Sequence, residues 1–208
     1  MYVAGRQRWR ISIDEPLSMR VALYLRDVHR LDPVTDPAIP VLDPPATAWP
    51  AWVRRPEESD LTPISEDLRR AAAGQWARWW RQSLLVDPGA AARDLVPPFR
   101  GFAHVPELRA LLRRDYHTAV RWSEAFADDP RLKRDHLAPG TQLARLVAEL
   151  ESVAGRDSRP FTLDISVISV RTKHAWVIAP DRLLITHHLI RDDENVLDWL
   201  RPRIRELV

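Results

Sequence analysis

The sequence predicts an α+β fold in which about four main helices pack with a small antiparallel sheet. Two long stretches with apolar residues at helical spacing, at 66–85 and 106–127, predict most of the helical part. Towards the C-terminus the pattern changes to an alternation of apolar and polar residues, which is typical of strands. A length of 208 residues and a hydrophobic content of 45% suit a single domain over residues 1–208.

The first predicted elements are a strand at 8–13 and a helix at 15–31. Apolar residues alternate with polar ones in the strand, so one of its faces is expected to be buried. Asp14 and Pro16 supply an N-cap and a first-turn proline for the helix. We expect the strand to join the edge of the C-terminal sheet. Its inward side chains are Trp9, Ile11 and Ile13.

Residues 32–64 are rich in proline and predict a strap that lies along the surface. Proline has a fixed φ and donates no amide hydrogen, so long regular structure is not expected here. The alternative is a free linker, which would not need two tryptophans. The side chains expected to pin the strap are Ile39, Val41, Leu42, Trp49 and Trp52.

The second predicted helix contains three tryptophans, Trp76, Trp79 and Trp80. At about 100° per residue their indoles lie within one sector of the helix, and Arg78 and Arg81 lie on the opposite side. The spacing therefore predicts that the indoles face inward and the guanidinium groups face solvent. The alternatives are a stacking platform for single-stranded nucleic acid, which needs Arg beside Trp, and an interface with another chain.

Two charged residues interrupt the apolar faces of the predicted helices. Asp115 falls near the middle of the apolar face of the 106–127 helix, and Arg69 falls in the tryptophan sector of the preceding helix. Burial of a lone charge costs on the order of several kcal/mol, so each needs a partner, either the other residue or a third group. The functional alternative is a pocket in which Asp115 and Tyr116 carry out acid–base chemistry.

The remaining helices are separated from these by a predicted loop at 86–105. Thr141 is expected to cap a short amphipathic helix, and Gly155 is expected to end it. The last helix is predicted at 193–207, where Pro202 should kink or split it, because proline cannot donate the helical hydrogen bond.

Three short strands are predicted at 161–167, 175–178 and 183–186, and their tight connections predict an antiparallel meander. His187 and His188 extend the last of them as an edge strand. Neighbouring side chains of a strand point to opposite faces, so these two imidazoles cannot share one metal ion without distortion. We therefore expect neither a metal nor another cofactor.

Composition excludes several classes of function. Cysteine is absent, so a disulfide or thiolate nucleophile cannot form. Six glycines and no phosphate-binding motif disfavour nucleotide chemistry, and a net charge of +2 disfavours nucleic acid as a partner. No signal peptide or transmembrane run is visible, which predicts a cytoplasmic protein without a membrane partner. Only Lys133 and Lys173 among the 31 basic side chains are lysines, a skew typical of a GC-rich bacterial genome.

These observations favour a non-catalytic protein-interaction module, that is, an accessory, regulatory or immunity-type subunit. Its expected partner is another protein, and a second copy of the chain is an alternative, because Trp and Arg are enriched at interface hot spots. The interface candidates are Trp49, Trp52, Trp76, Trp79 and Trp80.

Two other classes of function stay open. The first is a small-molecule enzyme or binder, which a cleft with convergent polar groups would favour over the interaction module. The second is a nucleic-acid-binding protein, which requires one continuous positive face. The residues expected in a polar pocket are Arg69, Asp115, Tyr116 and His174.

Overall fold

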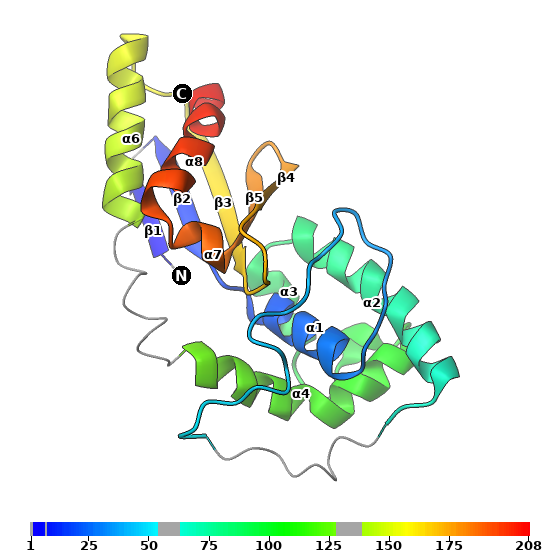
Figure 1. The fold of residues 1–208 in the computed structure, drawn as a ribbon. Coiled ribbons are helices and arrows are strands. Elements are labelled where there is room, and N and C mark those ends of the chain that lie inside the picture. The colour runs from blue at the N-terminus through cyan, green and yellow to red at the C-terminus, as the bar shows by residue number, and fades with distance from the viewer. Residues whose placement is uncertain (1, 7, 54–62, 128–138) are drawn as a thin grey trace. The chain divides into compact units, whose positions relative to one another are not determined.

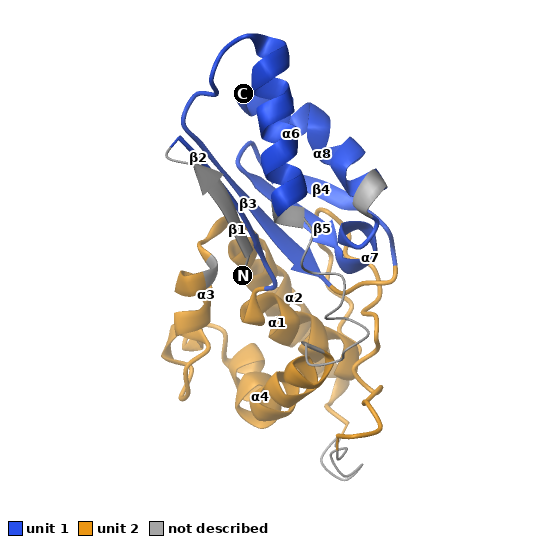
Figure 2. Cartoon of the chain, turned by 90° about the vertical axis from the view of Figure 1, so that its left-hand side faces the viewer, with its two compact units in different colours: residues 1–15, 131–168, 172–208 blue, residues 16–130, 169–171 orange. Residues whose placement is uncertain are grey.

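The computed structural model describes the chain except for residues 1, 7, 54–62 and 128–138 (Figure 1). The chain divides into two compact units, which are treated separately below (Figure 2). Helices and a mixed sheet are both present, which confirms the α+β fold class. A single domain over residues 1–208 stays a prediction. Unit 1 comprises residues 1–15, 131–168 and 172–208, and unit 2 comprises residues 16–130 and 169–171.

Unit 1 contains a five-stranded sheet in the order β1-β2-β3-β5-β4. The inner pairs β2–β3 and β3–β5 are parallel, whereas the outer pairs β1–β2 and β4–β5 are antiparallel. The bounds are Tyr2–Arg6 for β1, Trp9–Asp14 for β2, Phe161–Ile168 for β3, Ala175–Ala179 for β4 and Arg182–Thr186 for β5.

The predictions of an antiparallel meander and of an N-terminal edge strand were wrong. The strand β3 pairs with β5 and not with β4, and β2 lies between β1 and β3 rather than at an edge. The continuous apolar run Leu183–Ile185 is buried throughout, which is typical of an inner strand covered on both faces. The prediction of which face of β2 is buried was correct, because Trp9, Ile11 and Ile13 all lie in the core.

The described residues of unit 1 also form three helices: α6 (Pro139–Ala154), α7 (His187–Ile190) and α8 (Asp193–Leu207). The buried residues of α6 and α8 share one core with those of β2 and β3. Gly155 follows α6 with a φ of +64°, as its predicted role as a C-terminal cap requires.

The edge strand predicted for His187 and His188 was wrong, because both residues belong to α7. Pro202 was predicted to kink or split the last helix. It does not split α8, which continues through it from Asp193 to Leu207. A kink at Pro202 stays a prediction.

Unit 2 is helical, with α1 in contact with α2, α3 and α4 (Figure 1). The predicted bounds of α2 and α4 are confirmed, and Ser65 caps α2 by accepting a hydrogen bond from the Leu68 amide. The first helix is shorter than predicted, because Pro16 and not Asp14 is its N-cap. The bounds are Leu17–Val28 for α1, Glu66–Leu85 for α2, Pro88–Asp94 for α3, Arg100–Phe102 for the 3₁₀ turn η2 and Pro106–Ala127 for α4.

The helix α3 was missed, since 86–105 was predicted to be a loop. Asp87 caps it by accepting hydrogen bonds from the Gly89 and Ala90 amides at 2.9 and 3.2 Å. Pro88 occupies the first turn, where a missing amide hydrogen costs nothing. The Pro-Gly pair therefore opens a helix here instead of ending one.

The tryptophans of α2 form the centre of the unit 2 core, as predicted. Trp76 and Trp80 are buried and stacked, with ring centroids 5.3 Å apart and planes within 6° of parallel. Trp76 Nε1 donates a hydrogen bond to the Ala22 carbonyl of α1 at 2.6 Å. Arg78 and Arg81 face solvent. This arrangement gives no support to a nucleic-acid stacking platform on these two indoles.

The described parts of the strap are residues 32–53 and 63–64, and the first of these is held by hydrogen bonds between side chains of the helices and its backbone. Arg26 of α1 donates to the carbonyls of Ile39 and Pro40 at 2.9 and 2.6 Å, and Asp27 accepts from the Ala46 amide at 2.8 Å. Trp122 of α4 donates to the Ala48 carbonyl at 3.1 Å. The rest of the predicted strap, 54–62, lies outside the described residues.

The prediction of which side chains attach the strap to the rest of the protein was only partly correct. Leu42 is buried and its backbone bridges to Val170. Val41 and Trp52 are 55% and 62% exposed, so they do not pin it. Because neighbouring side chains of an extended segment alternate, the burial of Leu42 turns Val41 outward.

Candidate functional site

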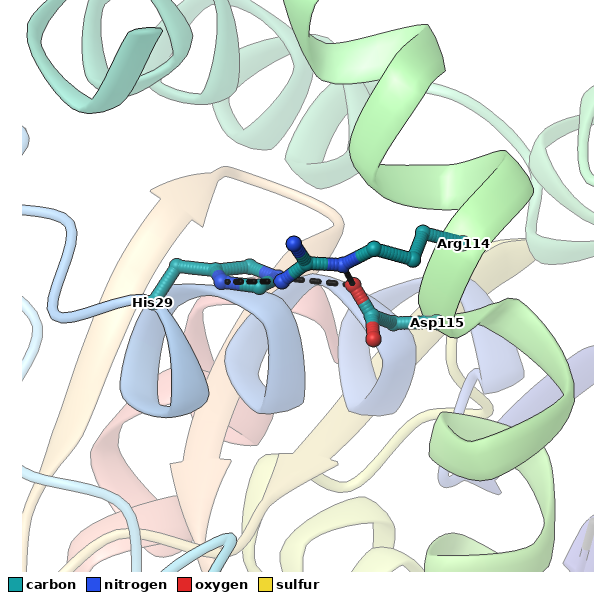
Figure 3. A network of polar contacts seen from close by, with 3 residues as sticks. All are labelled: His29, Arg114 and Asp115. Carbon is teal, nitrogen blue, oxygen red and sulfur yellow. Dashed lines mark hydrogen bonds and ion pairs between the residues drawn. The ribbon is translucent and has the colours of Figure 1, made fainter. Parts of the chain in front are cut away.

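The candidate site of unit 2 is built on a buried contact between α1 and α4. His29 is the C-cap residue of α1, and Asp115 lies in the middle of α4. His29 Nε2 lies 2.8 Å from Asp115 Oδ2, and the two side chains are only 4% and 5% exposed (Figure 3). Asp115 is thus a buried carboxylate with a polar partner, as the helical pattern required.

Arg114 completes this network from the surface side. Its Nε donates to Asp115 Oδ2 at 2.9 Å, and one terminal nitrogen lies 3.2 Å from His29 Nδ1 (Figure 3). The same nitrogen lies 3.4 Å from His29 Nε2, so it is nearly equidistant from the two ring nitrogens. The Arg114 guanidinium group therefore contacts both the Asp115 carboxylate and the His29 ring.

Tyr24 of α1 is a second polar group beside this network. Burial of its hydroxyl, together with the negative charges of Asp115 and Asp27, raises the pKa of Tyr24. Its ring packs against Trp122, with centroids 5.6 Å apart. The phenol therefore stays protonated at neutral pH and cannot serve as a base.

A cavity of about 290 Å³ opens beside the network within unit 2. Arg69 of α2 reaches it while keeping an ion pair with Glu66 at 2.5 Å. Arg30 reaches it from the turn after α1, where its backbone adopts a left-handed φ of 50°. The described residues that line the cavity are Val28, His29, Arg30, Pro63, Ile64, Arg69 and Arg114. The lining of this one cavity therefore includes three arginines and one histidine.

Arg69, Asp115 and Tyr116, which were predicted to share a polar pocket, do not form one group. Arg69 and Asp115 do not pair with each other; each has another partner, Glu66 for the first, and His29 with Arg114 for the second. Tyr116 is half-buried and packs edge-on against Phe99, with centroids 5.2 Å apart. It does not line the cavity.

His174 lies in unit 1 and is not part of this group. Its ring contacts Trp176 with centroids 4.7 Å apart, and its amide donates to Thr186 Oγ1 at 3.0 Å.

Three residues of the site were missed in the sequence: His29, Arg30 and Arg114. Arg114 directly precedes Asp115, so a search for partners near the buried carboxylate could have found it. His29 lies at the end of the apolar stripe of α1 and carries no motif. Arg30 depends on a left-handed turn that no local sequence feature marks.

The predicted interface tryptophans fall into two groups. Trp76, Trp79 and Trp80 are buried inside unit 2 and do not form a surface. Trp49 is half-buried, with the Arg121 guanidinium 6.0 Å from its ring centroid, and Trp52 is exposed.

Among the described residues, no three His, Cys, Asp or Glu side chains converge on a point that could hold a metal ion. None of the described helices combines the length and the apolar character needed to cross a bilayer.

A comparison of the chain with protein-family models, curated proteins and solved structures finds no match.

Proposed function

We propose that this protein is a binder of a small organic oxyanion, a carboxylate or a phosphate ester, which occupies the basic cavity of unit 2. The observation that carries the proposal is the convergence of Arg30, Arg69 and Arg114 on one cavity beside His29. A cleft with convergent polar groups is the feature that favours a small-molecule site over a protein-interaction module. We expect binding without catalysis, in the cytoplasm.

Charge supports an anionic ligand. Arg30, Arg69 and Arg114 line the cavity, and two carboxylates, those of Glu66 and Asp115, pair with two of these arginines. Among the described residues, three positive charges minus two negative charges leave an excess of one. Guanidinium groups present parallel N–H donors that match the two oxygens of a carboxylate or phosphate.

The cavity is also organised in advance. Asp115 holds the Nε of Arg114, and His29 fixes Asp115 in turn, so the guanidinium plane is oriented before a ligand arrives. Val28 and Ile64 supply an apolar wall that suits the carbon skeleton of an organic acid. A bare inorganic ion would gain nothing from that wall.

Calorimetric titration with butyrate, phenyl phosphate and inorganic phosphate tests the proposal. Arg30→Gly removes a guanidinium group at a positive φ that glycine adopts freely, so the fold is retained. Arg69→Gln removes a second one from the surface of α2. Each variant is expected to bind an organic probe about tenfold more weakly.

Arg113→Gln is the matched control, because Arg113 is exposed on α4 next to Arg114 and does not line the cavity. It should bind as the parent protein does. Equal losses in all three variants would refute the cavity as the site, because they would reflect the general positive charge. Failure of the parent protein to bind any of the probes at millimolar concentration would refute the proposal itself.

A protein-interaction module is the second candidate, and the strap favours it. The strap backbone is fixed, yet Val34, Val41 and Trp52 are 91%, 55% and 62% exposed. Preordered apolar side chains are what an interface hot spot needs. Light scattering and capture of partners from the native host should then show a complex that Trp52→Ser abolishes and Arg69→Gln leaves intact.

A further inference from the structure

A second pocket of unit 2 lies between α2, α3 and the η2 turn, and its volume is about 540 Å³. It shares no lining residue with the basic cavity. Its apolar part contains Trp79 and Phe102, whose rings meet nearly at right angles with centroids 5.1 Å apart. Its polar part contains the exposed side chains of Arg78, Arg93 and His104.

Small side chains keep this pocket open. Ala90 and Ala91 line it from α3, and Gly101 lines it from η2. A Cβ at Gly101 would lie 2.6 Å from Asp94 Oδ1, so a larger residue there would have to displace the Asp94 side chain. The space is therefore bounded by ordered helices and a tight turn.

We infer that this pocket binds a planar aromatic acid. The ring of such a ligand would contact Trp79 and Phe102 where these largely buried side chains line the pocket, because offset and edge-to-face contacts between aromatic rings are favourable. Its acidic group would pair with Arg78 or Arg93, whose two charges exceed the single opposing charge of Asp94. The volume lies within the usual range for small-molecule pockets, roughly 300–1,000 Å³.

The fluorescent dye 8-anilinonaphthalene-1-sulfonate is a suitable probe, because it combines a planar naphthalene ring with an acidic sulfonate group and its emission rises in an apolar site. Ala90→Phe fills the pocket from α3, and Arg78→Gln removes a cation from its rim. Relative to the parent protein, we expect the dye to bind at least about tenfold more weakly to Ala90→Phe and about fivefold more weakly to Arg78→Gln.

Each variant has a matched control on the same helix. Ala92→Phe adds the same ring on the exposed side of α3, and Arg81→Gln removes an exposed cation of α2; neither position lines the pocket. Both should bind the dye as the parent protein does. Circular dichroism and the melting temperature establish that the variants are folded.

Three results would overturn the inference. The first is the absence of dye binding to the parent protein at millimolar concentration. The second is equal affinity of Ala90→Phe and Ala92→Phe, which would place the dye elsewhere. The third is equal affinity for the neutral analogue N-phenyl-1-naphthylamine with no effect of Arg78→Gln, which would indicate an apolar anchor site for a partner protein rather than a site for an acid.

Discussion

His29 Nε2 and Asp115 Oδ2 lie 2.8 Å apart in the interior of unit 2 and join the end of α1 to the middle of α4. Burial of either side chain without the other would cost more free energy, because an unpaired carboxylate or imidazole loses its hydration without compensation. The contact also orients Arg114, which faces the basic cavity. One buried pair therefore links the stability of the helical unit to the geometry of its candidate site.

The first prediction concerns removal of the buried carboxylate. Asp115→Ala should destabilise the protein by about 3–5 kcal/mol, because it leaves His29 without its buried partner. For a chain of this length the melting temperature should fall by roughly 6–20 °C. Thermal unfolding followed by circular dichroism measures the change. Glu124→Gln, at an exposed position of α4, is the control and should shift the melting temperature little. An unchanged melting temperature for Asp115→Ala would falsify the structural role of the pair.

The second prediction contrasts two tryptophans. Trp76 is fully buried and donates to the Ala22 carbonyl, whereas Trp52 is 62% exposed. Trp76→Ala should cost about 3–5 kcal/mol, because it opens a large cavity beside Trp80. Trp52→Ala should change the free energy of unfolding by less than about 0.5 kcal/mol. Urea denaturation separates the two cases, and similar losses would contradict the assignment of Trp76 to the core and Trp52 to the surface.

Much of the helical part of the fold could be predicted from the sequence. The 3.6-residue period is a local signal, and strong caps such as Ser65 mark helix ends, so the bounds of α2 and α4 were correct. The inward direction of the indoles followed from the same period. The order of the strands could not be obtained in this way, because alternation shows which face of a strand is buried but not which strand lies beside it.

The candidate site was predictable only in part. Asp115 could be recognised because a charge on an apolar helix face needs a partner, but the identity of that partner depends on how α1 crosses α4. Of the two expected possibilities, a pair with Arg69 or a third group for each residue, the second is correct, because Arg69 pairs with Glu66, three residues earlier. His29 and Arg30 lie at the end of α1, where the chain makes a left-handed turn. That turn depends on tertiary packing, so the spacing of residues in the sequence could not identify these two.

The third prediction concerns attachment of the strap. Arg26 donates to two strap carbonyls, those of Ile39 and Pro40, and its own burial lowers the pKa of its guanidinium group. Arg26→Met keeps an unbranched side chain of similar reach and removes both donors. We expect a loss of about 2–3 kcal/mol, since the carbonyls lose hydrogen bonds from a charged donor.

Hydrogen exchange of the Ala46 amide reports on the same variant. That amide donates to Asp27, so it should exchange faster when the strap separates from α1. Arg20→Met, at another arginine of α1, is the comparison, because no hydrogen bond from Arg20 Nε holds the strap. Equal protection of Ala46 in Arg26→Met and the parent protein would show that the two carbonyl contacts do not anchor the strap.

The fourth prediction concerns acid stability in unit 1, where Asp192 caps α8. A hydrogen bond from Lys173, followed in size by one from Asn195, lowers the pKa of Asp192 to about 2. The folded-state pKa is thus below that of an unfolded aspartate, about 3.9. A carboxylate shifted in this direction contributes stability above pH 4, and the contribution is lost as the pH falls towards 2.

Lys173→Met removes the largest cause of this shift and leaves the cap contacts with Asn195 in place. The pKa of Asp192 should therefore rise towards, but not reach, the unfolded value, and an NMR titration of its carboxyl carbon measures the change. The acid-unfolding midpoint of the variant should move to a higher pH for the same reason. Arg205→Met, at an exposed cation in the last turn of the same helix, provides the comparison and should leave the titration unaltered. A pKa of Asp192 that stays near 2 in Lys173→Met would contradict the role of Lys173 and leave the shift to the Asn195 hydrogen bonds and the helix terminus.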